Sequence, residues 1–181
     1  RVDEPVDHPI IRPSINAMAE SYQLAEDDPD LATAWSSISE QQINRFLHVP
    51  ESSLDLVQKK KMQRRMGQLT GTCFQRCAGL DTLSVLFSIT YDIDKQHGTP
   101  YHERFVSFLK KAQSHNLIVG AGMTDPKGDR SKRPSSQSDP DLFMHVTRRT
   151  KEGLYVKGAK AHMTGGLNSH WICVMPTMNM L

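Results

Sequence analysis

Apolar residues in the first two thirds of the chain recur three or four residues apart, which is the spacing of an amphipathic helix. Pro5, Pro9 and Pro13 predict an extended arm before the first of these stretches. Residues 31–50 carry no clear period and stay ambiguous. The predicted helices cover residues 14–26 with Ser14 as cap, a stretch capped by Ser52 or Ser53, residues 72–95, and a stretch that opens at Thr99 and Pro100.

The predicted helix after residue 52 has two contrasting faces. Its apolar face carries Leu54, Val57, Met62, Met66 and Leu69. Its other face carries Lys59, Lys60, Lys61, Arg64 and Arg65. A solvated surface is the first interpretation of these five basic residues. The helix at 72–95 is apolar around much of its circumference, so we expect it to be central and buried.

The hydrophobic pattern changes near residue 117, where short apolar runs bounded by turn residues begin. They predict strands at 117–123, 142–150, 154–165 and 170–177, with a long polar loop over 124–141. The fold class is therefore α+β. We expect an N-terminal helical domain over residues 1–116, followed by the start of an antiparallel β domain over residues 117–181.

Composition and charge exclude several classes of protein. The chain of 181 residues is 38% hydrophobic and 23% charged, which is typical of a globular protein. A net charge of +2 is too small to indicate a nucleic-acid or membrane partner, and no apolar run is long enough for a membrane span. Three cysteines do not form a disulfide scaffold, so we expect a cytoplasmic protein. Because the chain starts with Arg1 and stops just after a predicted strand, we expect part of a longer polypeptide.

Cys73 and Cys77 lie four residues apart in the predicted helix at 72–95, so their side chains would share one face. Parallel side chains on one helix do not suit a disulfide, whereas two thiolates could bind one metal cluster. Buried structural cysteines are the alternative. Cys173 and His170 could complete a set of four ligands, although alternation along a strand places them on opposite faces.

Two polar segments near strand ends could bind a ligand. MTDPKGDR, residues 123–130, is a tight loop after a strand that offers backbone N–H groups together with Lys127 and Arg130. This suits an anionic or planar cofactor. AHMTGG, residues 161–166, offers the hydroxyl and amide of Thr164. Ordinary surface turns are the alternative interpretation of both segments.

Five segments in one order resemble the 4-hydroxyphenylacetate 3-hydroxylase family, in particular members that act on 4-hydroxybutyryl-CoA. The segments are VDHPIIRPSIN (6–16), KMQRRMGQ (61–68), CFQRCAGLD (73–81), MTDPKGDR (123–130) and GAKAHMTGGLNSH (158–170). The resemblance implies an acyl-CoA-dehydrogenase-like fold whose C-terminal helical bundle is missing from this chain. It also implies FAD, a 4Fe–4S cluster held by three cysteines and one histidine, and a homotetramer.

The resemblance assigns roles to single residues. Cys73 and Cys77 match two cluster ligands, so the other ligands are expected downstream and His170 and Cys173 are not ligands. Arg64, Gln75 and Thr164 match residues near the active site, and we treat these three as candidate catalytic residues. Trp171 stands where a glutamate is expected. The candidate flavin contacts are Met123, Thr124, Asp125, Lys127, Asp129, Arg130, His162, Met163, Thr164 and Gly165.

The implied reaction is dehydration of 4-hydroxybutyryl-CoA to crotonyl-CoA through a flavin-generated radical, with a cluster iron as Lewis acid. Isomerisation of vinylacetyl-CoA accompanies it. Two alternatives stay open. One is a flavin-dependent monooxygenase that hydroxylates a phenol and needs no cluster. The other is an inactive truncated scaffold without flavin.

Overall fold

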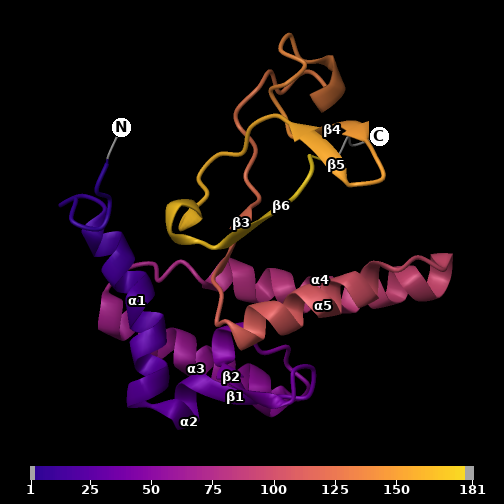
Figure 1. The fold of residues 1–181 in the computed structure, drawn as a ribbon. Coiled ribbons are helices and arrows are strands. Elements are labelled where there is room, and N and C mark those ends of the chain that lie inside the picture. The colour runs from indigo at the N-terminus through magenta and orange to yellow at the C-terminus, as the bar shows by residue number, and fades with distance from the viewer. Residues whose placement is uncertain (1–2, 178–181) are drawn as a thin grey trace.

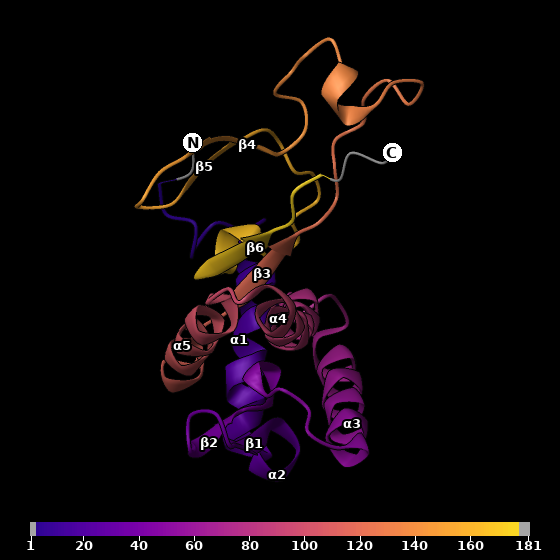
Figure 2. The ribbon, with the colours of Figure 1, turned by 90° about the vertical axis from the view of Figure 1, so that its right-hand side faces the viewer.

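The computed structural model describes residues 3–177, which form a helical layer and a layer of short strands (Figures 1 and 2). The helices are α1 (Arg12–Asp27), α2 (Pro29–Ala32), α3 (Ser53–Thr70), α4 (Cys77–His97) and α5 (Tyr101–Ser114). The strands are β1 (Thr33–Ser36), β2 (Gln41–Asn44), β3 (Val119–Gly122), β4 (His145–Arg149), β5 (Leu154–Lys157) and β6 (Trp171–Val174). Short 3-10 helices are η1 (Arg45–Leu47), η2 (Pro134–Ser136) and η3 (Gly166–Asn168). The mixed α and β class predicted from the sequence is confirmed.

Helix α1 begins two residues before the predicted Ser14 cap, with Pro13 in its first turn. Proline suits this position because its missing N–H has no partner in a helix start. The hydroxyl of Ser14 is instead used in a contact with a distant loop, described below. Met18, Ser21 and Leu24 lie on the buried face of α1.

The ambiguous region 31–50 forms the antiparallel hairpin β1–β2 and the single turn η1. Arg45 is buried there, and its guanidinium donates hydrogen bonds to the carbonyl oxygens of Asp30, Leu31 and Thr33. A buried arginine that satisfies three carbonyl groups holds α2 and β1 together. Because this contact uses a charged side chain, the hydrophobic pattern of residues 31–50 does not predict the hairpin.

Helix α3 starts with a capping box between Ser52 and Asp55, so Ser52 is the cap and the prediction of Ser52 or Ser53 is confirmed. Met62 and Met66 are completely buried, which confirms the centre of the predicted apolar face. The rest of that face, Leu54, Val57 and Leu69, is exposed, so the prediction is wrong for these three residues. Lys59 is wrongly assigned to the solvated face: it is buried, and its Nζ lies 2.6 Å from Oδ1 of Asp81 on α4.

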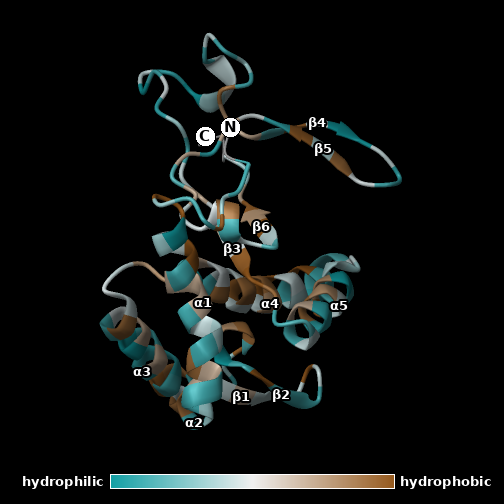
Figure 3. Ribbon diagram, turned by 60° about the vertical axis from the view of Figure 1, so that its left-hand side comes forward, coloured by the Kyte–Doolittle hydropathy of each residue, from teal (hydrophilic) through white to brown (hydrophobic). Residues whose placement is uncertain are grey.

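Helix α4 begins at Cys77, not at residue 72, and it is buried only over its first turns. Leu80 and Leu83 are buried, whereas Val85 and Ile89 remain 57% and 47% exposed, so the prediction of a central, buried helix is confirmed for the first turns and wrong for the rest. The hydropathy view shows the apolar residues of α4 next to β3 (Figure 3). No helix in the described residues is both long and apolar enough to cross a bilayer.

Helix α5 is capped from outside rather than by Thr99. The Asp94 carboxylate near the end of α4 accepts hydrogen bonds from the N–H groups of Tyr101 and His102 and from the Thr99 hydroxyl. The predicted apolar stripe of α5 is confirmed at Leu109 and Ala112, which are fully buried.

Two apolar clusters form the core on either side of η1. The first contains Leu24, Ala32, Phe46, Met62, Met66, Phe74 and Leu80. The second contains Ile43, Leu47, Val49, Leu83, Leu109, Ala112 and Val119. Helix α4 contributes to both clusters, which explains why its first turns are buried. Gly79 lets α4 approach β3, because a Cβ there would lie only 1.7 Å from the carbonyl oxygen of Val119.

The strands after residue 117 form two separate pairs in the described residues. β4 and β5 are antiparallel and joined by the turn at 151–153, as predicted. β3 and β6 are parallel, with Val119 opposite Trp171, so an entirely antiparallel arrangement was wrong. The long connection between β3 and β6 permits this, since parallel neighbours need a long crossover.

Candidate functional site

The two cysteines of the predicted cluster site do not share a helix. Gly71 ends α3 in the left-handed conformation, and Cys73 follows in an exposed loop. Cys77 is the first residue of α4 and is half-buried. The prediction of two thiols on successive turns of one helix is therefore wrong, because Gln75 between them has a φ of 65° and cannot continue a helix.

The loop nevertheless brings the two thiols together. Burial raises the pKa of Cys77, and the neighbouring Cys73 thiol raises it further through charge repulsion and a hydrogen bond. Two thiols close enough to affect each other's protonation are suitable for binding one metal centre. This proximity is compatible with a pair of cluster ligands, although it arises from a loop instead of a helical repeat.

Gln75 is buried and ties three distant segments together. Its Nε2 donates to the carbonyl oxygen and the hydroxyl of Ser14, at 3.0 and 2.6 Å. Its Oε1 accepts from Nδ2 of Asn168 at 3.0 Å, and the same Asn168 nitrogen lies 2.9 Å from the Ser14 hydroxyl. Gly165 packs against Gln75, since a Cβ there would come within 2.7 Å of the Gln75 Cβ. The candidate catalytic role of Gln75 stays a prediction, and both of its amide protons are already used in these bonds.

Arg76, the next residue, is buried without a carboxylate partner among the described residues. Its guanidinium lies between the rings of Tyr22 and Phe46, about 5 Å from each ring centre, and donates to Ser21 and Asn116. Burial lowers the pKa of Arg76 to about 10. It remains a cation at neutral pH, fixed by ring faces and neutral oxygens. Arg76 therefore anchors the cysteine loop to α1 and η1.

The two predicted flavin segments lie side by side, although almost forty residues separate them in the sequence. The N–H of Ala161 donates to the carbonyl oxygen of Thr124 at 2.8 Å. The buried Lys160 ammonium lies 2.5 Å from Oδ1 of Asp125 and 3.3 Å from the carbonyl oxygen of Met123. Burial alone would raise the pKa of Asp125, but hydrogen bonds from Lys160 and Thr177 hold it below its usual value. These contacts join residues 123–125 to Lys160 and Ala161.

Several side chains on this joined surface have no hydrogen-bond partner in the described part of the chain. Thr124, Thr164 and His162 are exposed, and their polar atoms are free for a ligand. Met123 and Met163 are 56% and 37% exposed. Free hydroxyl groups beside exposed thioether side chains suit one edge and one face of a flat ring system. The residues therefore fit a flavin.

Backbone conformation also marks the two candidate segments. His162 has a φ of 54° and Gln75 a φ of 65°, which is uncommon for residues other than glycine. Such conformations persist only where surrounding contacts enforce them, and they cluster at functional sites. They are independent of the residue types on which the sequence prediction depended.

The remaining candidate flavin residues continue from this surface into the long loop, where they line a hollow together with Asp125. Asp129 accepts hydrogen bonds from the hydroxyl and N–H of Ser131, which hold its pKa below the usual value. Lys127, Asp129 and Arg130 line a small hollow in the long loop, together with Gln137. Contacts of Arg64 with the other candidates are absent from the described structure, where it lies exposed on α3. Their proposed roles stay predictions.

The four-ligand site built from spacing alone is not formed. The described residues contain no group of three or more His, Cys, Asp or Glu side chains able to hold a metal ion. Nδ1 of His170 accepts a hydrogen bond from the N–H of Ile118 at 3.0 Å, so this ring holds the start of β3. Cys173 lies on β6 opposite Ala121. Cys73 and Cys77 fit two ligands of a cluster, not a complete set.

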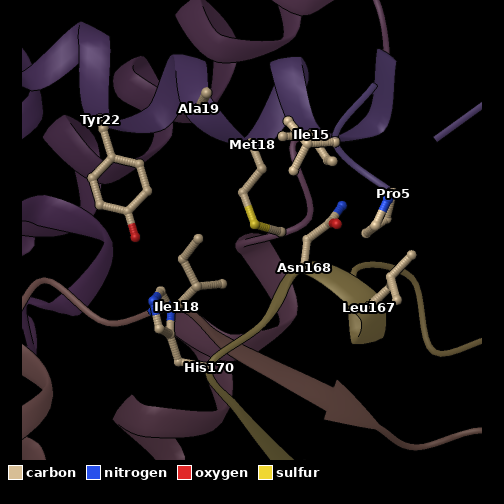
Figure 4. Close-up of a pocket in the computed structure, with 10 residues that line it drawn as sticks. Pro5, Ile15, Met18, Ala19, Tyr22, Ile118, Leu167, Asn168 and His170 are labelled. Atoms are coloured by element: carbon tan, nitrogen blue, oxygen red, sulfur yellow. Dashed lines mark hydrogen bonds between the residues drawn. The ribbon is translucent and has the colours of Figure 1, made fainter. Parts of the chain in front are cut away.

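A cavity of about 370 Å³ lies next to the Gln75 contacts (Figure 4). Met18 and Tyr22 of α1 face Asn168 and His170 across it. Sequence reasoning missed Ser14, Arg76, Lys160 and Asn168, which organise this region. For Arg76, the position between two candidate ligands was the available signal. For the others there was none, because their contacts span more than thirty residues.

The sequence resembles known proteins along most of its length. The sequence pattern of the family described as 4-hydroxyphenylacetate 3-hydroxylase N terminal matches residues 1–181. The chain is 50% identical over 182 residues to 4-hydroxybutyryl-CoA dehydratase/vinylacetyl-CoA-Delta-isomerase of Clostridium aminobutyricum, covering 99% of this chain and 37% of that protein. It is 22% identical over 169 residues to the 4-hydroxyphenylacetate 3-monooxygenase oxygenase component of Thermus thermophilus, covering 91% of this chain and 34% of that protein.

Among the solved structures, the chain is again more similar to a dehydratase than to a monooxygenase component. The oxygen-tolerant archaeal 4-hydroxybutyryl-CoA dehydratase from N. maritimus superposes with a TM-score of 0.95 at 58% identity, over 99% of this chain and 36% of that chain. The oxygenase component of 4-hydroxyphenylacetate 3-monooxygenase complexed with FAD superposes with a TM-score of 0.65 at 19% identity, over 88% of this chain and 33% of that chain. The second likeness is one of fold. The chain thus spans little more than a third of the length of these relatives.

Proposed function

The chain belongs to the 4-hydroxyphenylacetate 3-hydroxylase family, and from this premise we propose that it forms part of an enzyme that dehydrates 4-hydroxybutyryl-CoA to crotonyl-CoA. Isomerisation of vinylacetyl-CoA is the accompanying activity. The observation that carries the proposal is 50% identity to the clostridial dehydratase along nearly the whole chain, against 20% to 27% for the monooxygenases. A cytoplasmic homotetramer belongs to the same proposal.

Two cofactors would supply the chemistry that side chains lack. The reaction removes one water and leaves a double bond next to the thioester carbonyl. A hydrogen β to that carbonyl is barely acidic, and acid–base catalysis contributes only about 10²–10⁴-fold. When bound, FAD would supply one-electron transfer and a 4Fe–4S cluster would supply a Lewis-acidic iron.

The residues of this chain would bind and orient the two cofactors and keep water away from them. Cys73 and Cys77 would hold the cluster as thiolates, with further ligands from outside the described residues. The hydroxyl groups of Thr124 and Thr164 would hydrogen-bond the edge of the flavin, and the side chains of Met123 and Met163 would shield it from water. Gln75 joins the two sides, because it lies between the cysteines in sequence and packs against Gly165.

An assay of the protein purified without oxygen tests this proposal. The protein is incubated with 4-hydroxybutyryl-CoA, and crotonyl-CoA is measured by mass spectrometry. A parallel sample receives 4-hydroxyphenylacetate, reduced flavin and oxygen. Formation of crotonyl-CoA without hydroxylation of the phenol supports the dehydratase. Hydroxylation without dehydration would make the chain part of a monooxygenase instead, and neither product would support the inactive scaffold.

A further inference from the structure

One face of α3 is basic, exposed and not explained by the cofactor sites. Lys60, Lys61 and Arg64 are exposed on it, and Leu56 and Val57 between them are 50% and 48% exposed. We call these five residues the basic face of α3. Together they line a shallow hollow of about 410 Å³.

The cations of this face are not neutralised within the described residues. Lys60 donates only to the neutral Oε1 of Gln63, at 3.1 Å, and Lys61 and Arg64 make no ion pair there. The sole acid of α3, Asp55, is used in the capping box at the start of the helix. By contrast, Lys59 one residue away is buried and paired with Asp81. The run of lysines therefore divides into one structural residue and a charged surface.

This arrangement costs helix stability. Lys60 and Arg64 are four residues apart, and Lys61 and Arg64 are three apart, so like charges lie next to each other on the helix surface. An anionic ligand would remove this repulsion. Phosphate groups are suited to lysine and arginine side chains, and an apolar floor of Leu56 and Val57 is suited to a flat ring.

The distance between the basic face and the cysteines restricts which class of ligand could contact both. Helix α3 runs from the basic face towards Cys73, and the nine residues from Lys61 to Thr70 correspond to about 13 Å along the helix axis. A ligand with phosphates and a ring at one end, and a reactive group at the far end of a long arm, spans such a separation. Coenzyme A thioesters have this construction.

We propose that the basic face of α3 binds the phosphoadenosine diphosphate end of the acyl-CoA substrate. The proposal rests on the proposed function, since it assigns a second part of the same substrate to a second site. The pantetheine arm would follow α3 towards the cysteine loop. Arg64 lies one turn nearer to Cys73 than Lys60 does, so it is the cation of the basic face closest to the start of the pantetheine arm.

Calorimetry on the protein with its cofactors tests the site, with coenzyme A as one probe and pantetheine as the other. The test variant combines Lys60→Glu and Lys61→Glu, and the control is Lys95→Glu in the last turn of α4. We expect the Kd for coenzyme A to rise roughly tenfold or more in the test variant and to stay unchanged in the control. Pantetheine, which lacks the phosphates, should bind the test variant and the unchanged protein equally.

The charge reversal places an acid one turn before Arg64, which stabilises α3, so weaker binding does not report a lost fold. Equal affinity of the variant and the unchanged protein for coenzyme A would overturn this site and leave the proposed function intact. If the unchanged protein binds no coenzyme A, this site is overturned, and formation of crotonyl-CoA decides the proposed function separately. If the variant instead loses binding to phosphatidylserine vesicles at unchanged coenzyme A affinity, the face belongs to a lipid surface and the proposal is overturned.

Discussion

At the scale of single residues, Gln75 has a role that its sequence neighbourhood does not suggest. It lies between two candidate cluster ligands, yet its amide group bonds to Ser14 on α1 and Asn168 in η3. Its left-handed backbone allows the chain to leave the cysteine loop and enter α4. One side chain thus sets the relative position of the cysteine loop and the segment around Gly165.

Replacing Gln75 tests this role. Gln75→Ala removes the amide bonds to Ser14 and Asn168, and we expect the free energy of unfolding to fall by about 1–3 kcal/mol. We also expect turnover to fall further than iron content, because the cysteines remain while the segment at 165–168 loses its anchor. Urea unfolding, iron analysis and turnover on the same preparation measure these effects. Equal losses of turnover and iron would count against a positioning role.

His48 predicts how stability depends on pH. Its side chain is buried at 7% exposure, and Nε2 has no hydrogen-bond partner among the described residues, although Asp55 Oδ1 lies 3.5 Å away. Burial lowers the pKa of His48, and Asp55 only partly opposes this. The folded protein therefore binds this proton less strongly than the unfolded chain does. The free energy of unfolding should fall as the pH drops below about 6.5.

The measurement is urea unfolding at pH 7 and at pH 5 for the unchanged protein and for His48→Phe. We expect the variant to lose less stability between the two pH values. His97 in the last turn of α4 is exposed, so His97→Phe serves as the control and should keep the original slope. An identical slope in all three proteins would show that His48 is protonated as easily in the fold as outside it.

At the scale of elements, the contact between α4 and β3 depends on Gly79. An added Cβ would overlap the carbonyl oxygen of Val119, which is backbone and cannot turn away. Gly79→Ala should force α4 and β3 apart and lower the free energy of unfolding by about 1–3 kcal/mol. Gly67→Ala in α3 is the matched control, because a Cβ there meets nothing within 4 Å. The control should be neutral or stabilising by about 0.5–1 kcal/mol, since alanine favours a helix interior.

The two glycine variants are compared by thermal and urea unfolding. If Gly79→Ala were as stable as Gly67→Ala, the close approach of the helical layer to β3 would be wrong. The order of destabilisation, and not its absolute size, decides this point.

The sequence predicted elements well where one face of an element is buried locally. The stripe of α5, the centre of the α3 face and the β4–β5 hairpin depend on residues close in sequence, and their patterns are visible directly. The hairpin β1–β2 was missed because Arg45 and its carbonyl partners replace an apolar pattern. The start of α4 was placed five residues too early, since a left-handed Gln75 has no signature in composition.

At the scale of the whole molecule, the candidate site is a set of segments joined by long-range contacts. The resemblance identified the segments, and the structure joins 123–125 to 160–161 and Gln75 to Gly165 and Asn168. Such pairings arise only when the layers pack, so no local pattern encodes them. The parallel pairing of β3 with β6 is of the same kind.

The central claim is that Cys73 and Cys77 hold an iron–sulfur cluster next to a flavin surface. Its most direct test is iron, acid-labile sulfide and FAD per chain in protein purified without oxygen, for the unchanged protein, Cys73→Ser and the control Cys173→Ser. We expect about four iron ions and one FAD in the unchanged protein and in the control, with iron lost and FAD retained in Cys73→Ser. Flavin without iron in the unchanged protein, or iron that survives Cys73→Ser, would contradict it.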